Sequence, residues 1–172
     1  MKISYLRELF LFLLLILLQV LLLSRISLFG MATPLIYGYF LLKLPLGRNL
    51  FYVIISAFLM GLTIDIFLNT PGMNAAAITL VAMFRKSLMG LFFEKDEFEG
   101  FVPGMNNAPA PFVRFTIFTI FIHVTLLFFI ESFTLFNMIN TLLRIIISGV
   151  SSILLIIAID KLIYRRKNSE QS

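Results

Sequence analysis

The sequence predicts an all-α, polytopic membrane protein, built as a bundle of about six transmembrane helices. Hydrophobic residues make up 60% of the 172 residues and charged residues 13%, whereas a soluble domain is about half apolar and about a quarter charged. Apolar runs of roughly membrane-spanning length follow one another with only short polar breaks, and a helix needs about 20 such residues to cross the hydrocarbon core. Residues 1–172 are therefore expected to form a single integral membrane domain.

Six segments are candidate spans, with bounds set by the apolar runs: 5–23, 28–44, 50–68, 73–93, 112–130 and 139–162. Lys2 and Arg7 before the first run resemble the start of a signal peptide, but residues 24–27 offer no small-x-small cleavage site, so a retained helix is expected. The second segment contains Pro34 and Gly38, which both interrupt a regular helix. It is expected to be either a kinked span or a re-entrant hairpin.

The fourth segment offers only about 13 residues, or roughly 20 Å of helix, before the basic pair Arg85 and Lys86. We expect this pair to mark the water boundary and residues 88–93 to lie along the interface; a locally thinner bilayer is the alternative. Residues 94–111 are expected to form a cytoplasmic loop whose richness in Pro and Asn favours a flexible connector over an adaptor contact. Residues 163–172 are expected to form a short basic cytoplasmic tail.

The basic residues gather on one side of a six-span topology. The richer side holds Lys2, Arg7, Lys43, Arg48, Arg85, Lys86, Lys95, Arg114, Lys161, Arg165, Arg166 and Lys167. The other side holds only Arg25 and Arg144. The positive-inside rule assigns the richer side, with both termini, to the cytoplasm. A five-span topology would divide these basic clusters between the two faces.

Composition and motifs exclude several classes of function. Without cysteine, the chain has no disulfides, thiolate metal sites or cysteine nucleophiles, and a single histidine cannot build a multi-histidine metal site. The sequence contains no phosphate-binding glycine loop, nucleophile elbow, HExxH motif or pair of carboxylates on one helix face. No basic surface interleaved with aromatic residues is large enough for nucleic acid. We expect a protein that is not an enzyme and carries no cofactor or metal.

Four ionisable residues stand within or at the ends of the predicted spans: Asp65, His123, Glu131 and Arg144. A charge near the bilayer centre costs at least about 2.5–3.5 kcal/mol, so each should have a partner or lie at an interface. We predict that Arg144 pairs with Asp65, Glu131 or both near the extracytoplasmic ends of the spans. The alternative is that Glu131 and Arg144 extend into the lipid headgroups. His123 is expected to be hydrogen-bonded within the bundle and not to relay protons.

The junction of the third and fourth segments is expected to be a tight helical hairpin. Ala57, Gly61 and Asp65 fall at positions i, i+4 and i+8, so two small residues and a carboxylate share one helix face and allow another helix to approach closely. The dipeptide Pro71-Gly72 is typical of a turn, and Asn69 or Thr70 is expected to cap the helix that follows.

The segment from Gly61 through Asp65, Pro71 and Gly72 to the run Asn-Ala-Ala-Ala resembles the hairpin of the rod shape-determining protein MreD family. In that family a Gly-x-x-x-Asp helix end precedes a glycine-containing turn and a helix of small residues. The chain length, the short N-terminal tail, the approximate six spans and the basic C-terminal tail are also similar, so the resemblance covers essentially the whole chain. The abundance of phenylalanine and the loop at 94–114 resemble Bacteroidetes-type members.

This resemblance implies a non-enzymatic scaffold subunit of the cell-elongation (rod) complex in the bacterial inner membrane, regulating cell shape and peptidoglycan synthesis. The implied partners are an MreC-like bitopic protein, the actin-like MreB, RodA with its class B penicillin-binding partner, and membrane lipid. The family is also similar in fold to the substrate-binding subunits of energy-coupling-factor vitamin transporters, and such a subunit is the alternative function. That alternative needs a polar extracytoplasmic pocket, which the short, apolar outer loops 24–27, 69–72 and 132–140 do not favour.

Overall fold

The computed structural model describes residues 2–26, 33–94, 101–132 and 138–169 of the chain. The described residues form helices and no strand, so the all-α class is confirmed. Five helices are long and apolar enough to cross a membrane. They are α1 (Lys2–Leu21), α3 (Leu50–Leu68), α4 (Met73–Phe92), α5 (Pro109–Glu131) and α6 (Met138–Ser169). Two short helices, η1 (Leu23–Arg25) and α2 (Tyr39–Lys43), complete the described secondary structure.

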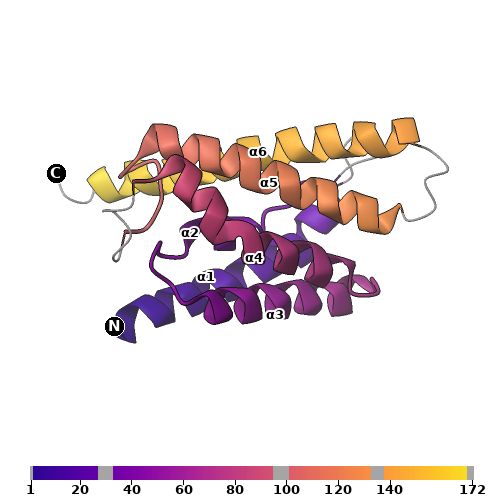
Figure 1. Cartoon of the computed structure of the whole chain (residues 1–172), viewed down its shortest axis with the longest axis horizontal. Helices are drawn as coiled ribbons and strands as arrows, with labels where there is room; N and C mark the ends of the chain where they lie inside the picture. Colours follow the sequence, from indigo (N-terminus) through magenta and orange to yellow (C-terminus); the bar gives the residue numbers. More distant parts are fainter. Residues whose placement is uncertain (1, 27–32, 95–100, 133–137, 170–172) are drawn as a thin grey trace.

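The long helices form one bundle in which neighbours run roughly along a common axis (Figure 1). Helix α4 packs against both α3 and α5, α5 packs against α6, and α1 packs against α3. Helix α1 begins and α6 ends at the same end of the bundle, which we call the terminal end, while the α3–α4 turn lies at the opposite end, which we call the hairpin end (Figure 1). This arrangement agrees with an even number of chain passages.

The second expected span differs from the prediction. Residues 28–32 lie outside the described residues, and the part that follows is extended or turned until α2, which has only 5 residues. Residues 34–42 are nevertheless all buried. The segment starts beside Gln19 near the end of α1 and reaches Asp160 near the end of α6, so it passes through the bundle from the hairpin end to the terminal end. It therefore completes a sixth passage without forming a sixth long helix.

Side chains of the surrounding helices satisfy the irregular backbone of this segment. Gln19 of α1 donates to the carbonyl of Pro34 at 3.2 Å and accepts from the amide of Ile36 at 2.8 Å. The amide of Leu35 donates to the hydroxyl of Ser152 in α6 at 2.7 Å. Non-helical backbone is tolerated at membrane depth only where protein buries it and supplies these partners. Pro34 explains why no helix passes through this position, because proline lacks the amide and restricts the residue before it.

Helix α4 runs unbroken through Arg85 and Lys86 and ends at Phe92, so the chain does not change its course at the basic pair. The side chain of Arg85 is 3% exposed and points into the bundle. Its Nε donates to the carbonyl of Leu41 at 2.7 Å, and one Nη donates to the carbonyl of Leu44 at 2.6 Å. The last carbonyls of a helix lack intrahelical partners. Arg85 thus caps α2, whereas its neighbour Lys86 is exposed.

The ends of the remaining segments also differ from expectation. Helix α5 begins at Pro109, and the described part of the preceding loop is tied down: the amide of Leu46 donates to the carbonyl of Phe101 at 2.9 Å. The flexible connector expected at 94–111 is therefore wrong for residues 101–108, while 95–100 lie outside the described residues. Helix α6 continues to Ser169, through most of the segment expected to be a tail.

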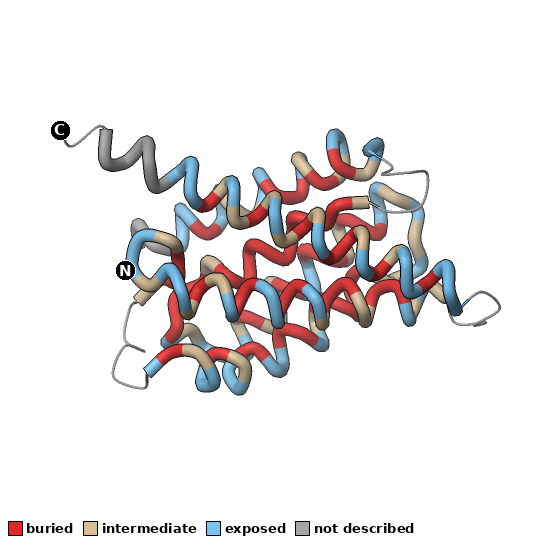
Figure 2. Tube along the Cα trace, turned by 90° about the horizontal axis from the view of Figure 1, so that it is seen from above, coloured by how far each residue is buried: buried red, intermediate tan, exposed pale blue. Residues whose placement is uncertain are grey.

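Buried and exposed residues alternate along the helices of the bundle (Figure 2). Many of the exposed residues are large and hydrophobic, and several polar side chains are buried. In α1 the exposed side chains include Leu6, Phe10, Leu13 and Leu17. The buried polar and charged residues are Glu8, Gln19, Asp65, Asn74, Arg85, Thr116, Thr119, His123, Thr141, Ser148, Ser152 and Asp160. This distribution suits a hydrocarbon solvent, in which polar groups must find partners inside the protein.

Candidate functional site

The α3–α4 hairpin is built by two left-handed backbone positions. Asn69 follows α3 at φ 54°, and Gly72 precedes α4 at φ 75°. Asparagine tolerates the left-handed region better than most residues, and glycine enters it without a steric penalty. Pro71 stands between them, and the amide of Gly72 donates to the carbonyl of Thr70 at 2.9 Å. The predicted turn is thus present, with α4 starting directly after Gly72.

Asp65 caps α4 from the preceding helix. Its Oδ2 accepts from the amide of Ala75 at 2.8 Å, and its Oδ1 accepts from the amide of Asn74 at 3.1 Å and from Asn74 Nδ2 at 2.8 Å. The Thr70 hydroxyl also donates to Oδ1. The carboxylate is 2% exposed and lies against a helix N-terminus, where amides and the helix dipole both favour an anion. The expected cap by Asn69 or Thr70 is wrong, since the side chain that caps α4 is Asp65, near the end of α3.

Arg144 pairs with Glu131 and not with Asp65. Its Nη2 lies 2.8 Å from Glu131 Oε1, with the two side chains 33% and 36% exposed. Its guanidinium also lies 4.6 Å from the centre of the Phe128 ring, in cation–π geometry. The expected Asp65–Arg144 pair is therefore wrong, because the α4 amides already provide for the Asp65 carboxylate. The Glu131–Arg144 pair is only partly shielded, so it is worth about 0–1 kcal/mol.

Gly61 lets the two helices of the hairpin touch. A Cβ atom at this position would lie 2.5 Å from the Cα and 2.6 Å from the amide nitrogen of Ala75. No side chain fits there without moving α3 away from α4. Ala75 is also the residue whose amide donates to Asp65, so the close approach at Gly61 and the cap at Asp65 depend on one helix separation. This confirms the predicted close approach along the small-residue face.

The hairpin is linked to the buried segment and to α5 through two aromatic side chains. The Tyr37 hydroxyl donates to Asn74 Oδ1 at 2.8 Å, and the Tyr37 ring meets the His123 ring edge-on, with centroids 4.8 Å apart. Gly38 packs so tightly against α5 that a Cβ would lie 2.8 Å from Ile120 Cδ1. Neither ring nitrogen of His123 has a hydrogen-bond partner among the described residues, so the expected hydrogen bond is not found. His123 acts here as a packed aromatic ring.

A small cavity of about 250 Å³, lined by both polar and apolar residues, lies beside this network at the hairpin end. Its lining includes Gln19, Thr70, Asn74, Glu131 and Arg144. The short outer loops do not predict this cavity; it forms where the ends of α1, α4, α5 and α6 meet. Cavities that hold small-molecule ligands usually measure about 300–1,000 Å³, so this one is slightly below that range.

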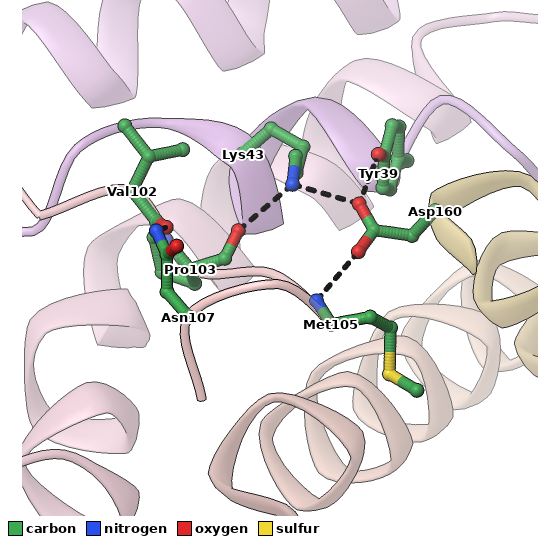
Figure 3. A network of polar contacts seen from close by, with 7 residues as sticks. All are labelled: Tyr39, Lys43, Val102, Pro103, Met105, Asn107 and Asp160. Carbon is green, nitrogen blue, oxygen red and sulfur yellow. Dashed lines mark hydrogen bonds and ion pairs between the residues drawn. The ribbon is translucent and has the colours of Figure 1, made fainter. Parts of the chain in front are cut away.

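A second buried carboxylate organises the terminal end (Figure 3). Asp160 of α6 is 4% exposed and accepts from the Tyr39 hydroxyl at 2.5 Å, from Lys43 Nζ at 2.7 Å and from the amide of Met105 at 2.7 Å. Lys43 also donates to the carbonyl of Pro103 at 2.9 Å. This cluster joins α2, α6 and the loop before α5, and it holds that loop against the bundle. The turn within this loop is closed by Asn107, whose side-chain Nδ2 donates to the carbonyl of Val102 at 3.1 Å (Figure 3).

A third carboxylate, Glu8 of α1, joins the first helix to the start of α3. Its Oε2 accepts from the Tyr52 hydroxyl at 2.9 Å, and its Oε1 pairs with the guanidinium of Arg48. That guanidinium also lies 4.0 Å from the centre of the Tyr5 ring. Sequence reasoning did not single out Glu8, although an acid one turn inside the first apolar run is a signal that its basic partner lies at the same depth.

The three buried carboxylates are therefore engaged by groups of the chain itself. Within the described residues, no group of three or more His, Asp or Glu side chains is placed to hold a metal ion. No family model, curated protein or solved structure matches the chain.

Proposed function

We propose that this protein is a non-enzymatic scaffold subunit of the bacterial cell-elongation machinery in the inner membrane. In this role it binds an MreC-like bitopic protein and stands beside MreB, RodA and the class B penicillin-binding partner of RodA. The observation that supports this proposal best is the state of Asp65, whose carboxylate accepts four hydrogen bonds from its own hairpin. The residues on which the resemblance to the MreD family depends thus stabilise the bundle and do not point into a reaction site.

The surface of the bundle supports the same proposal. A single-span partner needs an apolar helix face on which to pack, and α1 and α6 both present such faces, with Phe10 67% and Ile146 52% exposed. Lipid or another helix can cover these faces at similar free energy, because lipid tails are as apolar as leucine. Both termini in the cytoplasm would bring the terminal end of the bundle toward MreB.

The cavity at the hairpin end favours the alternative function, a substrate-binding subunit of an energy-coupling-factor-type vitamin transporter. Its lining is mixed and includes an arginine and a glutamate that could contact a small solute. Against this alternative, the Asn74 amide, which lines the cavity, is already bonded to Asp65, and the volume of about 250 Å³ is small.

Co-purification from native membranes tests the two functions against each other. We expect the tagged full chain, extracted in mild detergent, to retain an MreC-like single-span protein. Recovery of a vitamin, or of an ATPase module in place of that partner, would refute the scaffold role. Phe10→Ala and Ile146→Ala form a matched pair that removes exposed apolar surface from α1 or from α6. Weaker retention with only one of them would identify the helix face that the partner uses.

A further inference from the structure

A larger cavity, of about 790 Å³, lies at the terminal end between the start of α3 and the second half of α4. It falls within the range of about 300–1,000 Å³ that is usual for ligand sites. Three cationic side chains line it: Arg48 before α3, and Arg85 and Lys86 on α4. Nothing in the proposed scaffold role requires a cavity there, so its occupant is a separate question.

The charge balance of this cavity is positive. Glu8 neutralises Arg48 from the side of α1. Arg85 donates to the neutral carbonyls of Leu41 and Leu44. No carboxylate in the described part of the chain lies within ion-pair distance of Lys86. Among the described residues that line the cavity there is no acid. The cavity also opens on the N-terminus of α3, whose dipole adds partial positive charge. An anion is the complementary occupant.

The remaining lining is apolar, which distinguishes a lipid from a soluble anion. Leu46, Val53, Ala82 and Met89 form the inner wall of the cavity. At its edge Phe51 is 76% exposed on the first turn of α3, where an acyl chain leaving the cavity would meet it. Cationic groups above an apolar wall match the two parts of a phospholipid, a charged phosphate and a hydrocarbon chain.

We propose that this cavity binds the headgroup of an anionic phospholipid, with the exposed Lys86 facing the phosphate and the buried Arg85 adding positive charge from the wall. Basic pockets between transmembrane helices are a known way for membrane proteins to hold anionic lipids, and each Lys or Arg near the membrane surface adds about 1 kcal/mol of attraction, or about fivefold in affinity. Because Arg85 also caps α2, the lipid site and the buried segment share one side chain.

Two variants test this site without disturbing the bundle. Lys86→Gln removes an exposed charge, and Lys161→Gln is its control, because Lys161 is exposed near the end of α6 and does not line the cavity. Gly90→Leu places a side chain into the cavity, since a Cβ at position 90 meets no atom within 4 Å. Leucine also has a higher helix propensity than glycine, so this variant should fold at least as well as the native chain.

The experiment measures lipid retained by the full chain from nanodiscs containing phosphatidylglycerol or phosphatidylcholine, by native mass spectrometry. We expect preferential retention of phosphatidylglycerol, about fivefold weaker in Lys86→Gln, lost in Gly90→Leu and unchanged in Lys161→Gln. Equal retention of the two lipids, or full retention by both cavity variants, would overturn the proposal. A parallel titration with inorganic phosphate should leave the lipid in place. Displacement of the lipid by millimolar phosphate would show that the site binds a soluble anion instead.

Discussion

Replacing Asp65 by Asn removes one charge and changes almost nothing in shape, so it isolates the helix cap. The side-chain amide of the variant has only one oxygen. That oxygen is expected to take the place of Oδ1, which accepts three hydrogen bonds: from the Thr70 hydroxyl, from the backbone amide of Asn74 and from the Asn74 side chain. The new NH₂ group then faces the amide of Ala75, which loses its acceptor at a position closed to water.

The expected loss of stability follows from the bonds that change. A hydrogen bond to a charged group contributes about 1.5–3 kcal/mol, and a buried donor left without a partner costs about 1–3 kcal/mol. Some of this is recovered through small shifts of the hairpin, so we expect Asp65→Asn to lower the free energy of unfolding by about 2–4 kcal/mol. Glu131→Gln is the matched control at the same end of the bundle. The Glu131–Arg144 ion pair is about one-third exposed, so Glu131→Gln should lower the free energy of unfolding by no more than about 1 kcal/mol.

The assay is reversible unfolding of the full chain in mixed micelles, with denaturing detergent as the variable. A double-mutant cycle extends it, because Asp65→Asn and Arg144→Gln should be additive, whereas Glu131→Gln and Arg144→Gln should couple by about 0.2–1 kcal/mol. Two results would refute the reasoning: a loss below about 1 kcal/mol for Asp65→Asn, or strong coupling between Asp65 and Arg144.

Three further predictions concern other contacts. Gly61→Ala should lower the free energy of unfolding by about 1–3 kcal/mol, because its methyl group overlaps Ala75. Gly149→Ala is the control: its Cβ would make an ordinary 3.6 Å contact with Phe121, so it should be neutral or stabilising in the same assay. Asp160→Asn should release the loop at 101–108, seen as faster cleavage there by an added protease, and unchanged cleavage would contradict the role assigned to the cluster. Arg85→Gln should destabilise the chain by about 3–5 kcal/mol, because it leaves two buried carbonyls unpaired. An Arg85→Gln chain that unfolds like the native protein would show that α2 needs no cap.

The fold class and the hairpin could be predicted from the sequence because their signals are local. Apolar runs of spanning length identify the long helices, and the pattern from Gly61 to Gly72 identifies a close helical pair and its turn. The partner of Asp65 could also have been predicted from the sequence, because a carboxylate just before a turn faces the free amides of the next helix. Of the two partners predicted for Arg144, Glu131, which lies 13 residues earlier in the chain, is confirmed, and Asp65 is not.

The buried segment and the terminal end could not be predicted, because their contacts join residues far apart in sequence. Tyr39 and Asp160 are separated by 121 positions, and Leu35 and Ser152 by 117. Hydrophobicity alone does not distinguish a buried irregular segment from a buried helix. The same applies to Arg85. Its position beside Lys86 suggests an interface, but its side chain is buried because it donates to a carbonyl of α2, 44 residues away in sequence.

The irregular path of residues 33–46 also constrains how this protein is made. In lipid alone each unpaired peptide group costs several kcal/mol, so the segment gains nothing by inserting before its partners exist. One of those partners, Ser152, belongs to α6 and is made 117 residues after Leu35. The buried segment must therefore wait, near the interface or within the translocon, until α6 arrives and closes the bundle around it. A nascent chain that lacks α6 is the form in which quality control should detect an open core.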